Sequence, residues 1–351
     1  MLKLINITDL YHPHQDVGDN FDLIMPYGLP DVDMQLIILD CTAKFREPYA
    51  HHSEWPDTSG PREPGVIPVT QLNYIWGRNI SYGVGPFESM QSPSDKMENI
   101  SAYQSQGVDR LLSTLEKSDS PMDISVFGSL RCLAVAYNRN PALLLEKVRM
   151  VHISASSSTP DYLEWNVLLD PHAFVCIMRS ALPVTLYPCK TGTGAFAPHE
   201  FCTFWSLNNL EFVRKMDKRL QCYLSYAFNK TLRHDFLRAM DEEPTGLDNF
   251  CQHKHNVWET AIWIEMTGRK LVERQDGSFK IIPACEVIST DKVFQTENVP
   301  CIFAVQDTGI YEFTPCDIGE TNKFIHKIHD PHGQEKALNE ALGELYASLK
   351  P

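Results

Sequence analysis

Long apolar stretches are missing from this 351-residue sequence. No segment approaches the roughly 18 consecutive apolar residues of a membrane span, and we therefore expect no membrane contact. Residues 1–20 lack an apolar run behind a basic start, which predicts that there is no signal peptide. Basic residues are also in deficit: the net charge is −14 at pH 7, whereas a protein that binds duplex nucleic acid needs a basic face. The composition argues against that class and leaves a small neutral or cationic molecule as the expected partner.

Paired cysteines are missing as well, because none of the ten cysteines forms a Cys-x-x-Cys motif. They are scattered through apolar segments, as buried reduced thiols are, so we expect a cytoplasmic protein. Cys251, His253 and His255 alternate in a way that could bind zinc, but no second pair at finger spacing follows. Internal repeats and low-complexity linkers are absent too. We therefore expect a single domain over residues 1–351.

Short apolar runs alternate with amphipathic segments along much of the chain. Met34–Asp40 is almost continuously apolar, as strands buried on both faces of a parallel sheet are. Gly107–Lys117 carries apolar residues at helical spacing. Further strands are predicted over 122–127, 149–154 and 183–187, and further helices over 130–138 and 171–180. This alternation predicts an α/β fold, a Rossmann-like open and mostly parallel sheet flanked by helices.

Two regions depart from this alternation. Residues 46–66 are rich in proline, histidine and polar residues and follow a predicted strand, so we interpret them as a lid or substrate loop. After the strand at 183–187, helices are expected to dominate to about Thr267. Residues 270–316 favour strands and turns, and 334–349 predicts an amphipathic helix.

The most informative stretch is the beginning of the chain. Leu2–Ile7 is a predicted strand, and after Gly18 the pattern is that of a helix. Between and just beyond them, four acidic side chains that repel one another fall within fourteen residues: Asp9, Asp16, Asp19 and Asp22. A hard cation bound by oxygen atoms would relieve this repulsion. The alternative is that Asp16 or Asp19 only caps the helix.

Four segments in order resemble the inosine–uridine-preferring nucleoside hydrolase family. The first combines Thr8–Asp9 with Gly18–Asp19 at the start of a helix. The second, Gly128–Ala136, is similar to the family's Gly-Pro-Leu-Thr-Asn turn. The third and most specific, Glu164–Ala173, reads Glu-Trp-Asn-Val-Leu-Leu-Asp-Pro-His-Ala and is similar to Glu-Phe-Asn…Asp-Pro-x-Ala. The fourth, His255–Ala261, lies where the family has His-Asp-Pro-Leu-Ala at a helix start.

The resemblance extends from residue 4 to about residue 265 and implies a nucleoside hydrolase fold. Residues 270–351 match poorly, and we treat them as a C-terminal extension. The family hydrolyses the N-glycosidic bond of ribonucleosides with a bound calcium ion, and its members are commonly dimers or tetramers. The implied function is therefore calcium-dependent hydrolysis of a ribonucleoside or related ribosyl compound, in a homodimer or homotetramer.

The resemblance also assigns roles to individual residues. Asp9 is the expected general base and a metal ligand, and Asp19 is a second metal carboxylate. Arg131 lies where the family supplies a backbone carbonyl to the metal, so its side chain need not matter. Glu164 and Asn166 match the residues that bind the ribose hydroxyls; the alternative is that they are only polar groups at a strand end. These types suit the task, since one is a strong acceptor and the other both donates and accepts.

At the fourth segment, His255 is the expected acid for the leaving group, a role suited to imidazole, and Asn256 takes the position of a metal aspartate. Gly18 likewise replaces the first of two adjacent aspartates. Asp16 could compensate for these losses as a further metal ligand. The tripeptide His329–Pro331 matches the family more literally than His255 does, but it lies close to the end of the sequence.

The two missing carboxylates leave an alternative function open. With less negative charge, calcium affinity should fall. The chain would then be a catalytically weakened homologue that binds a nucleoside-like ligand or a protein partner. His12 or His14 could also shift the preference toward a softer metal.

Overall fold

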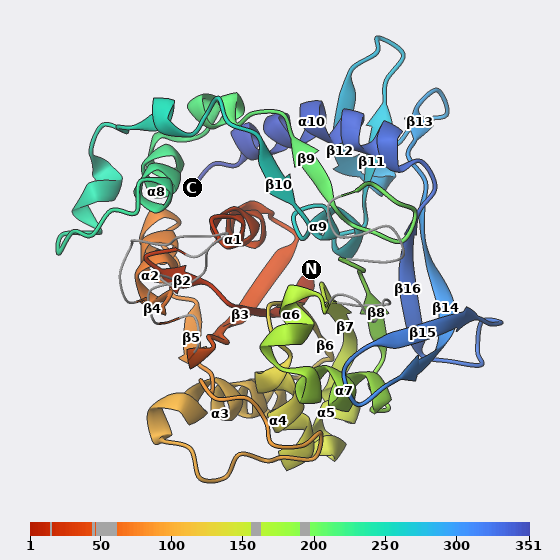
Figure 1. Cartoon of the computed structure of the whole chain (residues 1–351). Coiled ribbons are helices and arrows are strands. Elements are labelled where there is room, and N and C mark those ends of the chain that lie inside the picture. Colours follow the sequence, from red (N-terminus) through yellow and green to blue (C-terminus); the bar gives the residue numbers. More distant parts are fainter. Residues whose placement is uncertain (15, 44–45, 47–61, 156–162, 190–196) are drawn as a thin grey trace.

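The computed structural model describes residues 1–14, 16–43, 46, 62–155, 163–189 and 197–351. In this part of the chain, a nine-stranded sheet forms the centre of the molecule (Figure 1). In order across the sheet, its strands are β15 (Tyr311–Pro315), β14 (Thr296–Val305), β16 (Lys323–Ile328), β8 (Val184–Leu186), β7 (Val148–Ile153), β6 (Met122–Phe127), β1 (Leu2–Thr8), β3 (Val32–Leu39) and β5 (Ser81–Val84). The strands from β16 to β5 are parallel. At one edge, β14 pairs antiparallel with both β16 and β15. The predicted open, mostly parallel sheet is confirmed.

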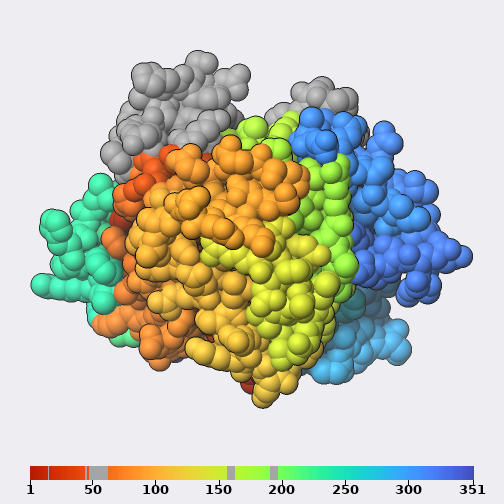
Figure 2. Space-filling model, turned by 90° about the horizontal axis from the view of Figure 1, so that it is seen from below, coloured from red at the N-terminus to blue at the C-terminus, as the bar shows by residue number. Residues whose placement is uncertain are grey.

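Apolar side chains cover both faces of the sheet, because successive residues of a strand point to opposite sides. On β1, Leu4 belongs to one buried cluster, and Ile5 and Ile7 belong to the other. The first cluster includes side chains from α1 (Gly18–Gly28), α2 (Val66–Ile75), α8 (Lys218–Phe228), α9 (Ile262–Met266) and α10 (Pro331–Ser348). The second includes α3 (Ala102–Lys117), α4 (Arg131–Arg139), α5 (Pro141–Lys147) and α7 (Pro171–Arg179). Helices therefore cover both faces, and the layer with α3, α4 and α5 is turned to the viewer in Figure 2.

Smaller elements surround this sandwich. A short helix, α6 (Trp165–Leu169), lies between β7 and α7. Two-stranded ribbons pair β2 (Tyr11–His12) with β4 (Glu63–Pro64) and β9 (Trp205–Leu207) with β10 (His255–Val257), and a separate sheet contains β11 (Arg269–Glu273), β12 (Phe279–Pro283) and β13 (Lys292–Val293). The 3-10 helices are η2 (Glu211–Lys215), η3 (Arg238–Asp241), η4 (Leu247–Asn249) and η5 (Ala284–Glu286).

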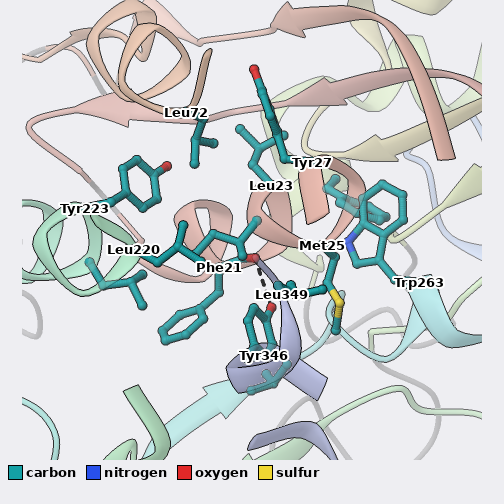
Figure 3. Packing of buried hydrophobic residues seen from close by; sticks show 14 of the residues in the cluster. Phe21, Leu23, Met25, Tyr27, Leu72, Leu220, Tyr223, Trp263, Tyr346 and Leu349 are labelled. Carbon is teal, nitrogen blue, oxygen red and sulfur yellow. Dashed lines mark hydrogen bonds between the residues drawn. The ribbon is translucent and has the colours of Figure 1, made fainter. Parts of the chain in front are cut away.

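The position of α1 is fixed by contacts with the far end of the chain (Figure 3). Phe21 packs edge-on against Tyr346, with ring centroids 5.5 Å apart. The Tyr346 hydroxyl donates a hydrogen bond to the backbone oxygen of Phe21 at 2.9 Å. Leu349 lies against Gly28 of α1: a Cβ added at Gly28 would be 2.8 Å from the Leu349 side chain. Helix α10 thus anchors the helix that carries Asp19.

Several predicted elements are found with shifted ends, two expectations were wrong, and one strand was missed. Residues 164–170 do not end a strand: Glu164 caps α6, which begins at Trp165. His255 does not start a helix, because it lies in β10 and the next helix begins at Ile262. Strand β16 was not predicted at all, although it joins the central sheet beside β8.

Two predicted regions have further outcomes. Residues 47–61 of the expected substrate loop lie outside the described residues, but its final part forms β4 and pairs with β2. Segment 270–351 supplies β14, β15, β16 and α10. It was expected to be a C-terminal extension, but three of its strands belong to the central sheet. Among the described residues, no helix is both long enough and apolar enough to cross a membrane.

Candidate active site

The carboxyl ends of the parallel strands bring polar residues to one edge of the sheet. Thr8 is in register with Leu39 of β3 and with Phe127 of β6. The next residues, Asp9, Asp40 and Gly128, therefore follow neighbouring strand ends. From β1 the chain proceeds outward to β3 and β5, and it returns to β6 on the other side of β1. Open α/β sheets bind their ligands at this kind of reversal in strand order.

Glycine at position 128 allows the turn after β6 to approach Asp9 closely. A Cβ at this position would lie 2.9 Å from the backbone nitrogen of Asp9 and 3.1 Å from its Cβ. Real Cβ atoms are essentially never found closer than 3.0 Å to a backbone atom. The Gly128 turn therefore sets the position of Asp9, the residue that the sequence placed at the centre of the site.

A group of acidic side chains gathers around Asp9. Its own side chain is buried, and burial together with the charges of Asp16, Asp40 and Glu164 raises its pKa to about 7. Burial, then Asp9 and Asp16, raises the pKa of Asp19 well above its usual value. These carboxylates lie within electrostatic reach of one another in a region of low dielectric, so they disfavour each other's charge.

Asp22 and Glu259 belong to the same group. Burial raises the pKa of Asp22 to about 8, although the Thr260 hydroxyl donates to its Oδ1 at 2.7 Å and opposes the shift. Glu259 was missed by the sequence reasoning. Its pKa is raised well above the usual value by burial and then by Asp22 and Asp16. The hydroxyl of Ser154, just beyond β7, donates to Glu259 Oε1 at 3.1 Å.

The signal for Glu259 was present in the sequence, since it follows Asn256 by three residues. It was passed over because the segment was expected to begin a helix at His255. In the structure β10 ends at Val257, and a turn then carries Glu259 to the acidic group. Because of this turn, the Glu259 side chain lies among the carboxylates, whereas the Asn256 side chain contacts Ser206.

The predicted ribose-binding residues lie at the start of α6. Glu164 caps this helix, and its carboxylate accepts hydrogen bonds from the backbone nitrogens of Asn166 at 3.0 Å and Val167 at 3.3 Å. The Asn166 side-chain amide donates to the backbone oxygen of Ser154 at 2.6 Å. Because the Ser154 hydroxyl also donates to Glu259, Asn166 and Glu259 are both held by Ser154 at the end of β7.

The similarity to solved structures agrees with this arrangement, although the sequence matches no family model and no curated protein. A plant nucleoside hydrolase superposes with a TM-score of 0.55 at 14% identity, over 96% of this chain and 98% of that one. An inosine–guanosine nucleoside hydrolase gives 0.56 at 15%, over 97% and 98%. A purine-preferring ribonucleoside hydrolase from Gardnerella vaginalis gives 0.57 at 12%, over 98% and 99%. The chain has the nucleoside hydrolase fold.

The nucleoside hydrolase fold that the four sequence segments implied is thereby confirmed. Coverage of at least 96% in these three comparisons extends the match into residues 270–351, where the sequence resemblance is poor. Structural similarity at 12–15% identity establishes the fold, and the assignment of activity rests on the site itself.

The fourth segment is split between the site and the surface. The Asn256 side chain is exposed, and its amide oxygen accepts from the Ser206 hydroxyl at 3.2 Å across the β9–β10 ribbon. The ring of His255 lies 5.7 Å from that of Phe21 and 6.1 Å from that of Phe228. Burial lowers the pKa of His255, and the charge of Asp16 opposes this shift. His255 is therefore near the acidic group, whereas Asn256 is directed toward β9.

The remaining candidates have other surroundings. Arg131 follows the Gly128 turn, so its backbone starts α4 beside Asp9, and its side chain is completely buried. Asp16 is exposed and accepts from the backbone nitrogen of Gly18 at 2.8 Å, a bond that helps to begin α1. His329 pairs with a glutamate at 3.2 Å, and Asp330 caps α10, so this tripeptide serves the C-terminal helix.

The acidic group fits a hard divalent cation by its chemistry. Its members are carboxylates, they raise one another's pKa, and carboxylate oxygens are the preferred ligands of calcium. No group of three or more histidine, cysteine, aspartate or glutamate side chains is close enough to hold an ion as the described residues are placed, and this includes the set at Cys251 and His253. A cation bound there by fewer carboxylates would need further oxygen ligands, such as backbone carbonyls.

Proposed function

We propose that this protein is a nucleoside N-ribohydrolase that cleaves the N-glycosidic bond of a ribonucleoside or related ribosyl compound. One observation supports this more than any other. A buried group of mutually repelling carboxylates lies at the switch point of a nucleoside hydrolase fold, beside the capped helix that carries Glu164 and Asn166. The transition state of this reaction resembles an oxocarbenium ion, which nearby negative charge stabilises.

Asp9 is the proposed general base. A carboxylate accepts a proton from water most effectively when its pKa is near the operating pH, and burial with neighbouring charges raises the pKa of Asp9 to about 7. Glu164 and Asn166 are the proposed ribose-binding groups. Their orientation is already set by hydrogen bonds to the α6 backbone and to Ser154, so little freedom is lost when hydroxyls bind.

The proposed cofactor is calcium, with Asp9 and Asp19 as ligands, Asp16 and the backbone oxygen of Arg131 as further candidates, and Asn256 disfavoured by its contact with Ser206. A divalent cation there would neutralise the acidic group and make an adjacent water more acidic. His255 is the proposed donor to the leaving base. Its burial favours the neutral imidazole, which keeps one N–H to donate.

A second candidate function follows from the two missing carboxylates at positions 18 and 256. A catalytically weakened homologue would bind a nucleoside-like ligand or a protein partner without cleaving it. Calorimetry with calcium and then with inosine separates the two functions. Ligand binding without release of free base would favour this second function.

The proposal is tested by incubating the full chain with a panel of purine and pyrimidine ribonucleosides and calcium, and measuring free base by chromatography. We expect release from at least one nucleoside and a loss of at least about 10²-fold in Asp9→Asn, since a general base typically contributes that much. Asp33→Asn is the matched control, because Asp33 lies at the amino end of β3. Equal activity in Asp9→Asn and in the unaltered chain would refute the proposal.

Two further expectations stay predictions. The resemblance implies a homodimer or homotetramer, which sedimentation analysis of the purified chain would show. The expected cytoplasmic location rests on the cysteine pattern alone, and fractionation of the source cells would test it.

A further inference from the structure

Arg131 has a completely enclosed basic side chain near the candidate site. It is 0% exposed. The guanidinium lies between two carboxylates that are also fully buried, with its Nε 2.9 Å from Asp170 Oδ2 and its Nη1 3.5 Å from Asp40 Oδ1. A single positive charge between two buried negative ones is stable only when the arrangement is closely defined.

Hydrogen bonds from the same guanidinium reach three further acceptors. Nη1 donates to the backbone oxygen of Pro86 at 2.8 Å. Nη2 donates to the hydroxyl of Thr42 at 3.1 Å and to the backbone oxygen of Leu169 at 3.0 Å. The planar fork of arginine can serve acceptors in several directions at once, whereas the ammonium of lysine is a single point charge. One side chain therefore connects the loops after β3 and β5 with the junction of α6 and α7.

This junction lies at the other end of the helix that carries the ribose-binding candidates. Leu169 is the last residue of α6, and Asp170 follows it and caps α7. Five helical residues span only about 7–8 Å. Fixing the end of α6 at Leu169 thus also fixes its beginning, where Glu164 and Asn166 lie.

The other end of the connection lies at Asp9. Arg131 is the first residue of α4, three residues after Gly128, whose backbone touches Asp9. The backbone nitrogen of Cys132 also donates to Asp40 at 2.8 Å, so the start of α4 and the end of β3 are held together. The acidic group and the ribose-binding helix are thus joined through Arg131.

We propose that the Arg131 side chain is a positioning group, which holds α6 at a set distance from Asp9 and so aligns the ribose with the general base. Its catalytic consequence rests on the proposed function. The sequence resemblance assigned a role only to the backbone carbonyl of this residue.

The test compares Arg131→Lys with Arg149→Lys in the full chain with calcium. Arg149 is the matched control, since it makes a two-point contact with buried Asp123 at 2.7 and 2.9 Å, but near the amino ends of β6 and β7. Amide hydrogen exchange is followed along the chain, and kcat and KM are measured with inosine. We expect faster exchange in Arg131→Lys at residues 164–173 and in the loops that contain Thr42 and Pro86, with the rest of the chain unchanged. We also expect a loss of about 10–100-fold in kcat/KM, the size expected for a small misplacement of reacting groups.

Arg149→Lys should change kcat/KM for inosine by less than about twofold. Faster exchange spread evenly over the sheet in Arg131→Lys, or a loss of kcat/KM no larger than that of Arg149→Lys, would overturn the proposal. If the unaltered chain cleaves no nucleoside, the proposed function fails, and the exchange pattern alone decides the role of Arg131. If Arg131→Lys does not fold, Thr42→Val removes one acceptor and keeps both ion pairs; unchanged exchange at residues 164–173 in that variant would also overturn it.

Discussion

At the scale of single residues, the turn after β10 decides which side chain lies in the candidate site. Asn256 and Glu259 are three residues apart, yet the first contacts Ser206 at the surface and the second lies among the carboxylates. The site therefore keeps a carboxylate from this part of the chain, although not at the position where the resemblance placed it. This observation weakens the expectation that the missing aspartate at position 256 lowers the calcium affinity.

We expect Glu259→Gln to weaken calcium binding by about tenfold or more, since ligand charge tunes affinity at oxygen sites. Asn256→Ala should change the affinity by less than about twofold, because the side chain is exposed. Calorimetric titration with calcium measures both. The reverse order of effects would mean that Asn256 is the ligand after all.

Gly128→Ala should displace Asp9, because the new methyl group would lie 2.9 Å from its backbone nitrogen. We expect a loss of about 1–3 kcal/mol in the free energy of unfolding, as for other overpacked positions, and a larger proportional loss of nucleoside cleavage. Urea denaturation and a base-release assay measure the two effects. Gly77→Ala is the control for adding a methyl group, since no atom lies within 4 Å there and only its positive φ is strained. Full activity in Gly128→Ala would show that Asp9 tolerates the shift.

A site residue could be predicted from the sequence where its position depends on neighbouring residues, and not where it depends on distant ones. Asp9 and Asp19 flank a strand and a helix start, so their position was readable from short-range pattern. The role of Glu259 depends on a turn between β10 and α9, and the contacts of Arg131 depend on loops far apart in the sequence. Such contacts carry no periodic signal.

At the scale of elements, the short helix α6 is the part on which the proposed ribose-binding groups depend. Its five residues are too few to give a helical period, and the sequence was therefore expected to end a strand there. The start of the next helix was better indicated, because Asp170–Pro171 is a recognisable helix start, and the helix predicted from residue 171 is confirmed. A helix start marked by Asp-Pro could thus be predicted from the sequence, whereas a five-residue helix could not.

The contact between α1 and α10 gives a prediction at this scale. Tyr346→Phe removes only the hydroxyl that donates to Phe21, so we expect a loss of about 0.5–1.5 kcal/mol in the free energy of unfolding, the usual net value of a hydrogen bond. Tyr103→Phe is the control, because Tyr103 is exposed on α3. Chemical denaturation monitored by circular dichroism compares them. Equal midpoints in the two variants would show that the hydrogen bond contributes nothing.

At the scale of the whole molecule, the sheet joins residues that are far apart in sequence. The resemblance to nucleoside hydrolases faded near residue 265, yet β16 lies beside β8 and carries β14 and β15 at the edge. The alternating pattern of residues 270–316 indicated strands, but it could not indicate which sheet they join. The fold class was therefore predictable from the first two-thirds of the chain. The sheet edge formed by β16, β14 and β15 was not predictable.

Stability of the whole chain against acid gives a further prediction. Burial acts to raise the pKa of Asp123, but hydrogen bonds from His152 and Arg149 outweigh it and lower the pKa. The folded value thus lies below the unfolded one of about 3.9, so this carboxylate stabilises the fold above that pH and loses its effect as the pH falls through the folded value. We expect Asp123→Asn to be less stable at neutral pH, with a shallower loss of stability below about pH 4. Thermal melting from pH 6 to pH 3 tests this, and parallel curves would contradict it.

The contact of α10 with α1 has a consequence for synthesis on the ribosome. The helix that carries Asp19 is made within the first thirty residues, but its partners Tyr346 and Leu349 are made some three hundred residues later. Until then the apolar side of α1 lacks its final cover, and such surfaces attract chaperones or other chains. The acidic group can therefore reach its final arrangement only after Tyr346 and Leu349 have been made and have packed against α1.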